Sequence, residues 1–368
     1  MPRTLAAGGL LACALLAAPA CAADEVLSDA ASGERMDIVV TAQKRSERAL
    51  AVPLSLTVLG ERPTERTRLT QADDLAAQVP NLQFSATVGE NTPIFALRGV
   101  SMSDFSLNQA GPVATYYDEV YKGNFAFLGV QLFDLDRIEV LRGPQGTLYG
   151  KNTTGGAINL VATAPTPHNE GYLLAGVGNF GRAETNGAVN LRLDPRLALR
   201  VAFTAARADG WFRNRLPGAP DLSGTREYAV RASLAWTPSD TTRFLLRLST
   251  SLQNPTNYGN YSAPGAAGVG AGAYEAYGAG RSYFRQGLGP RELAAEFTPR
   301  RHARTWSAAL TGEFALGAGL NLTTVTAWDK GSLFVPEDTD GSPLRVLEIP
   351  YTDRGTQFSQ DLRLATDW

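Results

Sequence analysis

The chain has 368 residues, a formal net charge of -2 at pH 7 and 37 glycines, a length that accommodates two domains. No strong charge bias points to a nucleic-acid partner, and none is expected. Both cysteines lie before residue 23 and the two histidines, His168 and His302, are far apart, so neither a disulfide nor a metal site is predicted.

Residues 1–22 have the pattern of a secretory signal peptide. Arg3 precedes an apolar run from Leu5 to Ala18, and the small residues 20–22 form a cleavage site. A retained membrane anchor is the weaker interpretation, because the run is too short to span a bilayer comfortably. A lipoprotein is disfavoured as well, because the leucine usual three places before the cysteine is missing. We expect this segment to be removed on export.

Residues 23–51 are expected to form a flexible leader with one β-branched run. The run is Asp37, Ile38, Val39, Val40, Thr41 and Ala42, and no neighbour in its own segment is predicted to pair with it. An extended peptide of this kind can add as a strand to the sheet edge of a partner protein. An ordinary edge strand is the alternative.

Residues 52–166 are predicted to form an α+β domain. A short helix is expected over 72–79, where Pro80 stops it, and 125–135 is expected to be a short amphipathic segment. Strands are predicted where apolar and β-branched residues cluster or alternate, at 54–59, 82–85, 94–100, 113–121, 137–142 and 157–161.

The stretch from Asp134 to Val161 organises this domain. After the alternating strand 137–142, glycines follow at 143, 146, 150, 155 and 156, where they allow positive φ or close backbone approach. A phosphate-binding loop is excluded, since only three residues separate the glycines at 146 and 150 and Lys151 precedes an asparagine. A generic glycine-rich hairpin of a soluble domain is the remaining alternative.

This stretch resembles the plug-domain signature of TonB-dependent outer-membrane receptors. The matching elements are R-I-E-V-L-R-G-P at 137–144, L-Y-G at 148–150 and G-G-A-I-N at 155–159, and an L-R-G element occurs at 97–99. The resemblance implies a plug motif made of Arg98, Gly99, Arg137, Glu139, Arg142, Gly143, Pro144, Gly146, Tyr149, Gly150, Gly155, Gly156 and Asn159.

The resemblance also implies sites for two partners. Residues 37–42 resemble the TonB box, which would bind the energy-transducing protein TonB on the periplasmic side. No signalling module, as some family members carry, fits between the cleavage site and this box. Met102, Phe105 and Asn108 lie in an irregular loop, 101–112, of the kind that faces outside and touches the ligand in the family. A surface loop without a ligand is an equal alternative.

Residues 167–368 repeat a pattern of alternating apolar and polar residues. Eight strands are predicted, at 171–179, 182–193, 197–207, 225–237, 241–253, 301–316, 320–335 and 353–366. Their lengths suit transmembrane β-strands, although a large soluble β-sandwich would also alternate. After the first connection, three-residue turns alternate with long loops, which favours an outer-membrane β-barrel. Tyrosines of the longest loop (258, 261, 274, 277 and 283) are ligand contacts or flexible filler.

Eight strands are few for a barrel that must hold a plug, since plugged transporters have about 22. The sequence therefore predicts an incomplete barrel, and we expect an amino-terminal portion of a receptor. A complete small barrel is the alternative. Arg98, Arg137, Glu139 and Arg142 are expected to pair with charges on the strands, namely Arg231, Arg247, Glu313 or Asp361, unless water solvates them.

The resemblance implies active import of a scarce ligand across the outer membrane of a Gram-negative cell. The ligand would be a ferric siderophore or similar iron complex, with a carbohydrate or cobalamin as alternatives. A truncated receptor remnant that does not transport is the competing hypothesis. No cofactor is expected, and an enzyme is not predicted, because the sequence has no nucleophile triad, paired acid dyad or nucleotide fingerprint.

Overall fold

The structure, a computed structural model, describes residues 38–60, 69, 72–85, 93–104, 106–130, 132–260, 288–339, 341–343, 345 and 347–366. These residues lie in one compact unit, Ile38–Trp368. The expected signal peptide, Asp37 and Phe105 fall outside the described residues, so the predictions made for them are unchanged. Among the described residues no helix is both long and apolar enough to cross a membrane.

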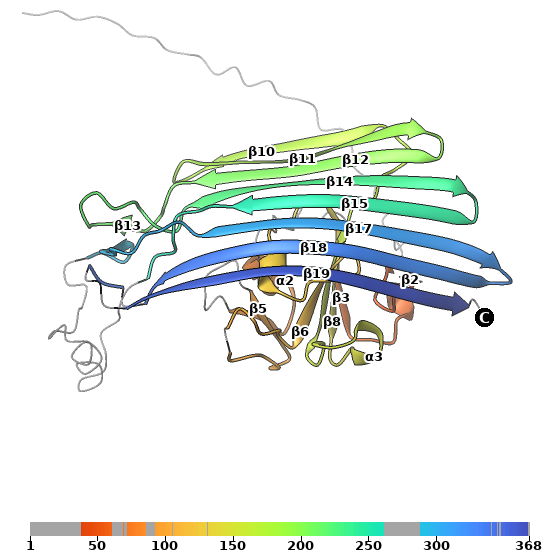
Figure 1. Ribbon diagram of the computed structural model, residues 1–368, viewed down its shortest axis with the longest axis horizontal. Coiled ribbons are helices and arrows are strands. Elements are labelled where there is room, and N and C mark those ends of the chain that lie inside the picture. The colour runs from red at the N-terminus through yellow and green to blue at the C-terminus, as the bar shows by residue number, and fades with distance from the viewer. Residues whose placement is uncertain are drawn as a thin grey trace, which may run out of the picture. The chain divides into compact units, whose positions relative to one another are not determined.

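The carboxyl-terminal half is an antiparallel sheet of eight strands in chain order (Figure 1). The strands are β10 Glu170–Gly178, β11 Arg182–Asp194, β12 Leu197–Ala208, β14 Thr225–Ser239, β15 Thr242–Gln253, β17 His302–Gly317, β18 Leu320–Asp338 and β19 Glu348–Thr366. All eight predicted strands are confirmed, and β19 begins five residues earlier than predicted, at 348 rather than 353. Within the described residues β10 and β19 do not pair with each other, so the sheet is open.

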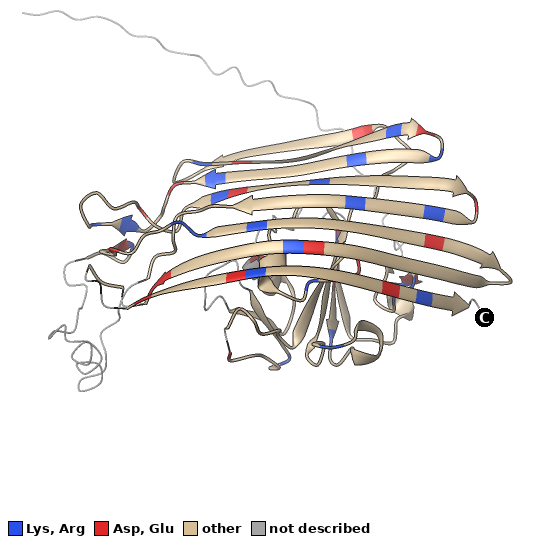
Figure 2. Ribbon diagram, viewed as in Figure 1, with Lys and Arg blue, Asp and Glu red and all other residues tan. Residues whose placement is uncertain are grey.

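The two faces of this sheet differ in polarity. Large apolar side chains such as Trp306, Leu310 and Phe358 are exposed on one face, with Phe358 70% exposed. Buried side chains on the strands include polar and charged ones such as Arg231 and Asp329. Figure 2 shows acidic and basic residues along the strands, including adjacent ones on β18. An apolar outer face and a polar inner face are typical of a sheet that meets lipid and disfavour the soluble β-sandwich.

Residues 38–162 form an α+β unit, called the plug here. Its five-stranded sheet has the order β3 Leu56–Leu59, β8 Leu135–Arg142, β9 Gly156–Ala162, β6 Val113–Tyr117 and β7 Val120–Tyr121. The remaining elements are β1 Val39–Val40, β2 Glu47–Arg48, η1 Ala49–Ala51, α2 Ala72–Gln78, β4 Leu82–Ser85, β5 Ile94–Leu97, η2 Phe125–Phe127 and α3 Gly146–Tyr149. Its core packs α2 and β5 against the central strands through fully buried residues such as Leu97, Ile138 and Ile158.

Two local predictions for the plug and its leader are wrong. The single strand predicted at 113–121 is two strands joined by the two-residue turn Asp118-Glu119, where φ is 48° and 69°. Positive φ at both positions is the type I′ geometry that matches the twist of a hairpin. In the segment 125–135, which was expected to be amphipathic, η2 buries Ala126 and Phe127, and β8 begins at Leu135. The leader run has a partner after all, because β1 pairs with β2.

One further pair of short strands was not predicted. Strand β13, Arg213–Asn214, pairs in parallel with β16, Glu292–Leu293, and so joins two long loops. Phe212, Leu222 and Leu293 pack together beside this pair. Two residues per strand are too few for a periodic pattern to show in the sequence.

The plug contacts the sheet through a notch made by two glycines. Gly331 of β18 and Gly355 of β19 lie opposite each other in the strand pairing. A Cβ on Gly331 would overlap the carbonyl oxygen of Ala126, and one on Gly355 would lie 2.9 Å from the Phe127 ring. The glycine notch therefore accepts η2 because neither strand carries a side chain there.

We expect Gly331→Ala to destabilise the protein by about 1–3 kcal/mol, because the added methyl group meets backbone atoms that cannot rotate away. The measurement is the thermal unfolding midpoint in detergent. Gly178→Ala in β10 is the control, since its nearest atom would lie at an ordinary 3.5 Å. Equal midpoints for the two variants would contradict close docking of η2.

Candidate functional site

The run 38–42 is folded onto the plug. Strands β1 and β2 form a hairpin closed by a turn in which Lys44 N donates to Thr41 O at 2.8 Å. Val40 and Ala42 are fully buried and pack with residues that include Leu141 and Tyr149. The segment that the sequence analysis assigned as a partner-binding peptide is thus held on the plug, with Val39–Val40 as a strand.

Glu139 of β8 connects this hairpin to the plug sheet. Its Oε1 accepts hydrogen bonds from Thr41 N at 2.8 Å and from Thr41 Oγ1 at 3.1 Å. Arg137 Nε donates to the same oxygen at 2.7 Å, and Asn159 Nδ2 donates to Oε2 at 3.3 Å. Glu139 is fully buried. Three residues of the predicted plug motif therefore form one network around Thr41.

Lys44, at the hairpin turn, makes a second contact with the plug. Its ammonium group lies 4.9 Å and 4.7 Å from the ring centroids of Tyr116 and Tyr149. Burial lowers the pKa of the Lys44 amino group, while the nearby Glu119 carboxylate opposes this effect. The Lys44 carbonyl oxygen accepts a hydrogen bond from Arg363 Nη1 of β19 at 2.9 Å. The hairpin turn is therefore bound by both the plug and the sheet.

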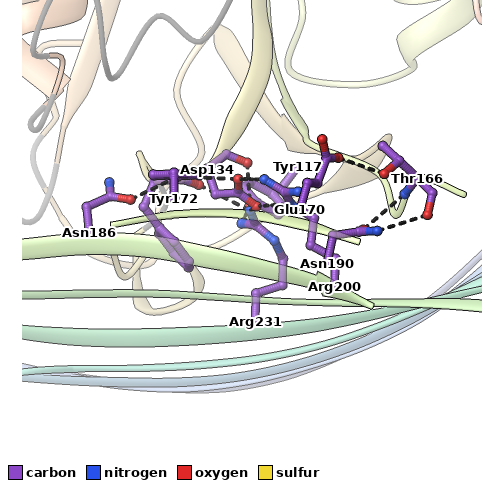
Figure 3. Close-up of polar contacts among 10 residues, drawn as sticks. Tyr117, Asp134, Thr166, Glu170, Tyr172, Asn186, Asn190, Arg200 and Arg231 are labelled. Atoms are coloured by element: carbon purple, nitrogen blue, oxygen red, sulfur yellow. Dashed lines mark hydrogen bonds and ion pairs between the residues drawn. The ribbon is translucent and has the colours of Figure 1, made fainter. Parts of the chain in front are cut away.

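Asp134 forms the most buried charged contact between the plug and the sheet (Figure 3). Arg200 Nη2 and Nε lie 2.5 Å and 2.9 Å from its two carboxylate oxygens. Arg231 Nη2 lies 3.3 Å from Oδ2 and also donates to the Asp134 carbonyl oxygen at 2.8 Å. All three side chains are at least nine-tenths buried. One carboxylate thus joins the plug to β12 and β14.

The β6–β7 hairpin and the residue after it make further ion pairs with the sheet. Asp118 Oδ2 lies 3.2 Å from Arg247 Nε of β15, and Glu119 pairs with Arg363 of β19. Just after the hairpin, Lys122 Nζ lies 2.6 Å from Asp329 Oδ1 of β18. These contacts reach β15, β18 and β19, so the hairpin fixes where the plug lies on the sheet.

The pairing predicted between charged residues of the plug and of the sheet is only half right. Arg231 and Arg247 do bind plug acids, but these are Asp134 and Asp118 and not any of the predicted plug residues. Arg137 pairs within the plug with Asp136 and Glu139. Arg98 and Arg142 donate to plug oxygens that include Ser55 Oγ. The sheet residue Glu313 pairs with Arg243, and Asp361 lies beside Arg363.

The reason for this error is local geometry. Side chains in the middle of β8 meet neighbouring plug strands, whereas side chains at turns project beyond the plug. Asp118, Glu119 and Asp134 all have positive φ, at 48°, 69° and 48°. Such positions favour Asp over most residues, since it tolerates the left-handed region. An acidic pair between two apolar strand runs was the signal that could have identified the turn at Asp118 and Glu119, although not their partners.

Several glycines of the predicted plug motif have backbone angles or close contacts that a residue with a side chain would not tolerate. Gly99, Gly143, Gly150 and Gly156 have positive φ. At Gly156, the first residue of β9, a Cβ would also overlap the Leu141 carbonyl oxygen of β8, so only glycine fits at this position. Gly155 packs against Val100 and Val113, while Pro144 lies in the turn before α3, which begins at Gly146. Buried Tyr149 accepts a hydrogen bond from the Tyr116 hydroxyl at its carbonyl oxygen.

The loop 101–112 reaches the opposite end of the sheet from the hairpin β1–β2. Met102 is half-buried and Asn108 is exposed. Leu107, which the sequence analysis did not select, packs in a cluster with Leu333, Val335 and the Tyr258 ring. The tyrosines predicted at 261–283 lie outside the described residues. In the part of the chain that is described, no group of three metal-ligating side chains occurs.

Comparisons with known proteins identify the plug. Residues 48–157 match the family model TonB-dependent Receptor Plug Domain. The pesticin receptor of Yersinia pestis is 33% identical over 240 residues, which are 64% of this chain and 33% of that receptor. The vitamin B12 transporter of Vibrio vulnificus is 28% identical over 155 residues, 41% of this chain and 24% of the transporter.

Solved structures share the fold. The ferric yersiniabactin uptake receptor of Yersinia pestis superposes with a TM-score of 0.68 at 24% identity, covering 86% of this chain and 46% of that one. The ferripyoverdine receptor of Pseudomonas aeruginosa gives a TM-score of 0.67 at 16% identity, with 89% of this chain and 41% of that one covered. The chain spans about a third of the length of the pesticin receptor and under half of these structures.

We expect Asp134→Asn to cost about 3–5 kcal/mol of stability, because it leaves Arg200 and Arg231 buried without a compensating charge. The measurement is the midpoint of denaturant-induced unfolding in detergent. Asp136→Asn is the matched control, since that carboxylate is 55% exposed and pairs with Arg137 of the plug itself. A loss no larger than that of the control would show that Asp134 does not hold the plug.

Proposed function

Because the chain belongs to the TonB-dependent receptors, we propose that it is part of an importer that carries a scarce ligand across the outer membrane with energy supplied by TonB. The observation that carries this proposal is the run 38–42, held as a short strand on a plug that ion pairs fix to the inner face of a sheet. In the proposal, residues 37–42 are the TonB box and residues 52–166 are the plug domain.

Contacts near the two ends of the sheet indicate which side of the membrane the box and the loop 101–112 would face. Arg363, which holds the box hairpin through Lys44, pairs in the sheet with Thr323, close to the short turn 317–319. Leu107 of the loop 101–112 packs near the other end of β18, beside Leu333. Short turns lie on the periplasmic side of outer-membrane barrels and long loops lie outside. The box therefore faces the compartment of TonB, and the loop faces the exterior.

We propose a ferric siderophore or similar iron complex as the ligand. Two structures with the same fold are described as a ferric yersiniabactin uptake receptor and a ferripyoverdine receptor. Cobalamin is a second candidate, because vitamin B12 transporters are among the relatives. Met102, Phe105 and Asn108 are the proposed ligand contacts. For ligand binding to be coupled to TonB binding, the ligand must bind more tightly to the state in which the box is accessible. A ligand with equal affinity for both states would not shift the equilibrium between them.

Val39 offers the sharpest test of the box assignment. Alternate residues of a strand direct their backbone groups to opposite edges. Ile38 O accepts from Ala49 N of the β2 side, so Val39 directs its N–H to the other edge, where a partner strand would add. Val40 is fully buried, and proline there would disrupt the hairpin as well.

We expect Val39→Pro to weaken binding of the periplasmic domain of TonB about tenfold, because proline removes a backbone donor and disfavours strand addition. The measurement is a titration of the purified chain in detergent. Val39→Ala, which keeps the N–H, should bind as the unchanged protein does. Equal affinities for the two variants would contradict the box assignment.

A further inference from the structure

We propose that five basic residues on the outward face of the sheet form a binding site for a lipid whose headgroup carries two phosphate groups. The residues, called the cation row here, are Arg207, Arg226, Arg304, Lys330 and Arg354. The inference goes beyond the proposed function, because it concerns the lipid around the protein and needs neither a transported ligand nor TonB.

The strand register places three members of the cation row on the outward, apolar face. Directly opposed residues of antiparallel strands have their side chains on the same side of the sheet. Lys330 lies opposite Trp306, which is 43% exposed on the apolar face. Arg304, two residues before Trp306, lies opposite Ser332, and Ser332 lies opposite Arg354. These three cations on β17, β18 and β19 are therefore close neighbours on one surface.

The other two members, Arg207 of β12 and Arg226 of β14, lie directly opposite each other. They belong to the same face, since Tyr228, two residues after Arg226, is 44% exposed there. Like charges directly opposite each other in neighbouring strands destabilise a sheet. Neither guanidinium has an ion-pair partner in the part of the chain that the structure describes. An anion bound between them would replace this repulsion with attraction.

Positive charge on the outward face is confined to the end that leads to the long loops. In the described strands, every outward position between the cation row and the short turns carries an uncharged residue. Beyond the row, the outward acids Asp338 and Glu348 lie opposite each other, and Asp338 is only 4% exposed. Figure 2 shows basic residues near the loop ends of β12, β14 and β17. Charges on a lipid-facing surface cost least near the membrane interface, so the row lies at the headgroups of one leaflet.

The spacing of the cation row fits two phosphates. Arginine binds phosphate oxygens through paired hydrogen bonds. Arg207 and Arg226 form one group, and the cations of β17, β18 and β19 form a second. Strand β15 lies between the two groups, which puts them about 10 Å apart at the usual strand spacing. One phosphate cannot contact both groups, whereas two phosphates on one headgroup can.

The apolar surface next to the cation row identifies the occupant as a lipid. Arg304 Cζ lies 5.0 Å from the centroid of the Trp306 ring, which holds the guanidinium at the border of the apolar surface. Large apolar side chains continue from there towards the short turns, among them Leu310 and Phe358, which are 42% and 70% exposed. Phosphate contacts and acyl-chain contacts therefore adjoin. Free phosphate would use only the first of these surfaces.

The experiment titrates the full chain in a non-ionic detergent with bisphosphoryl lipid A, a glycolipid with one phosphate at each end of its headgroup. Bound lipid is counted by native mass spectrometry. We expect about tenfold weaker binding by the double variant Arg207→Gln/Arg226→Gln, and by Arg304→Gln/Lys330→Gln, because each loses one phosphate contact. Arg196→Gln is the matched control and should bind as the unchanged chain does, since this 55% exposed cation lies at the short turns.

Two further measurements separate binding from folding. Without lipid, Arg207→Gln should leave the thermal unfolding midpoint unchanged or raise it, because it removes a contact between like charges. Arg207→Lys/Arg226→Lys keeps both charges but loses the paired hydrogen bonds, so it should retain part of the affinity. Monophosphoryl lipid A should bind the unchanged chain more weakly than the bisphosphoryl form.

Four results would each overturn the inference. Equal lipid affinity of the glutamine double variants and the unchanged chain would show that the cation row is not the site. Equal affinity for the two forms of lipid A would exclude a headgroup with two phosphates. Displacement of the lipid by excess inorganic phosphate would make free phosphate the ligand. A lower midpoint for Arg207→Gln without lipid would give the arginines a role in folding alone. The proposed function is tested separately by TonB binding to Val39→Pro.

Discussion

The ion pair between Asp134 and two strand arginines, Arg200 and Arg231, is the constraint on which the rest of the structure depends. Burying charges costs free energy that their mutual attraction repays only with close geometry and further hydrogen bonds. Both conditions hold here, since Arg231 also binds the carbonyl oxygen of Asp134. Such a contact adds little net stability over an apolar one, but it permits one orientation only. The plug therefore lies where its turn acids meet the basic side chains of the sheet.

Periodicity explains what the sequence could and could not predict. The eight long strands follow from alternation over many residues and from the turns between them, and the glycine motif follows from its resemblance to a known domain. The β1–β2 hairpin was missed, because two residues per strand carry no measurable period. The ion pairs of Asp118, Glu119 and Asp134 were missed for another reason, since pairing between residues 66 to 244 positions apart depends on how the chain packs. The contact of Gly331 and Gly355 with η2 could not be predicted either, because a glycine in a strand has no side chain to indicate what it packs against.

The proposed function unites these features in one path from the outer loop to the box. The loop 101–112 contacts the far end of β18 through Leu107, the β6–β7 hairpin binds β15 and β19, and Arg363 of β19 holds the box turn. A ligand that shifts the plug against the sheet would alter the same contacts that retain the box. Fixed contacts at Asp134 and at the glycine notch would keep the rest of the plug in place during that shift.

A charge exchange at Lys122 and Asp329 tests the central claim, that buried ion pairs hold the plug on the sheet, most directly. The two side chains are 5% and 3% exposed and lie 2.6 Å apart. Lys122→Asp and Asp329→Lys should each lower the unfolding midpoint, because each buries two like charges. The double variant should recover most of that loss. If the double variant is as unstable as the sum of the single variants, the plug is not held by this pair and the account is contradicted.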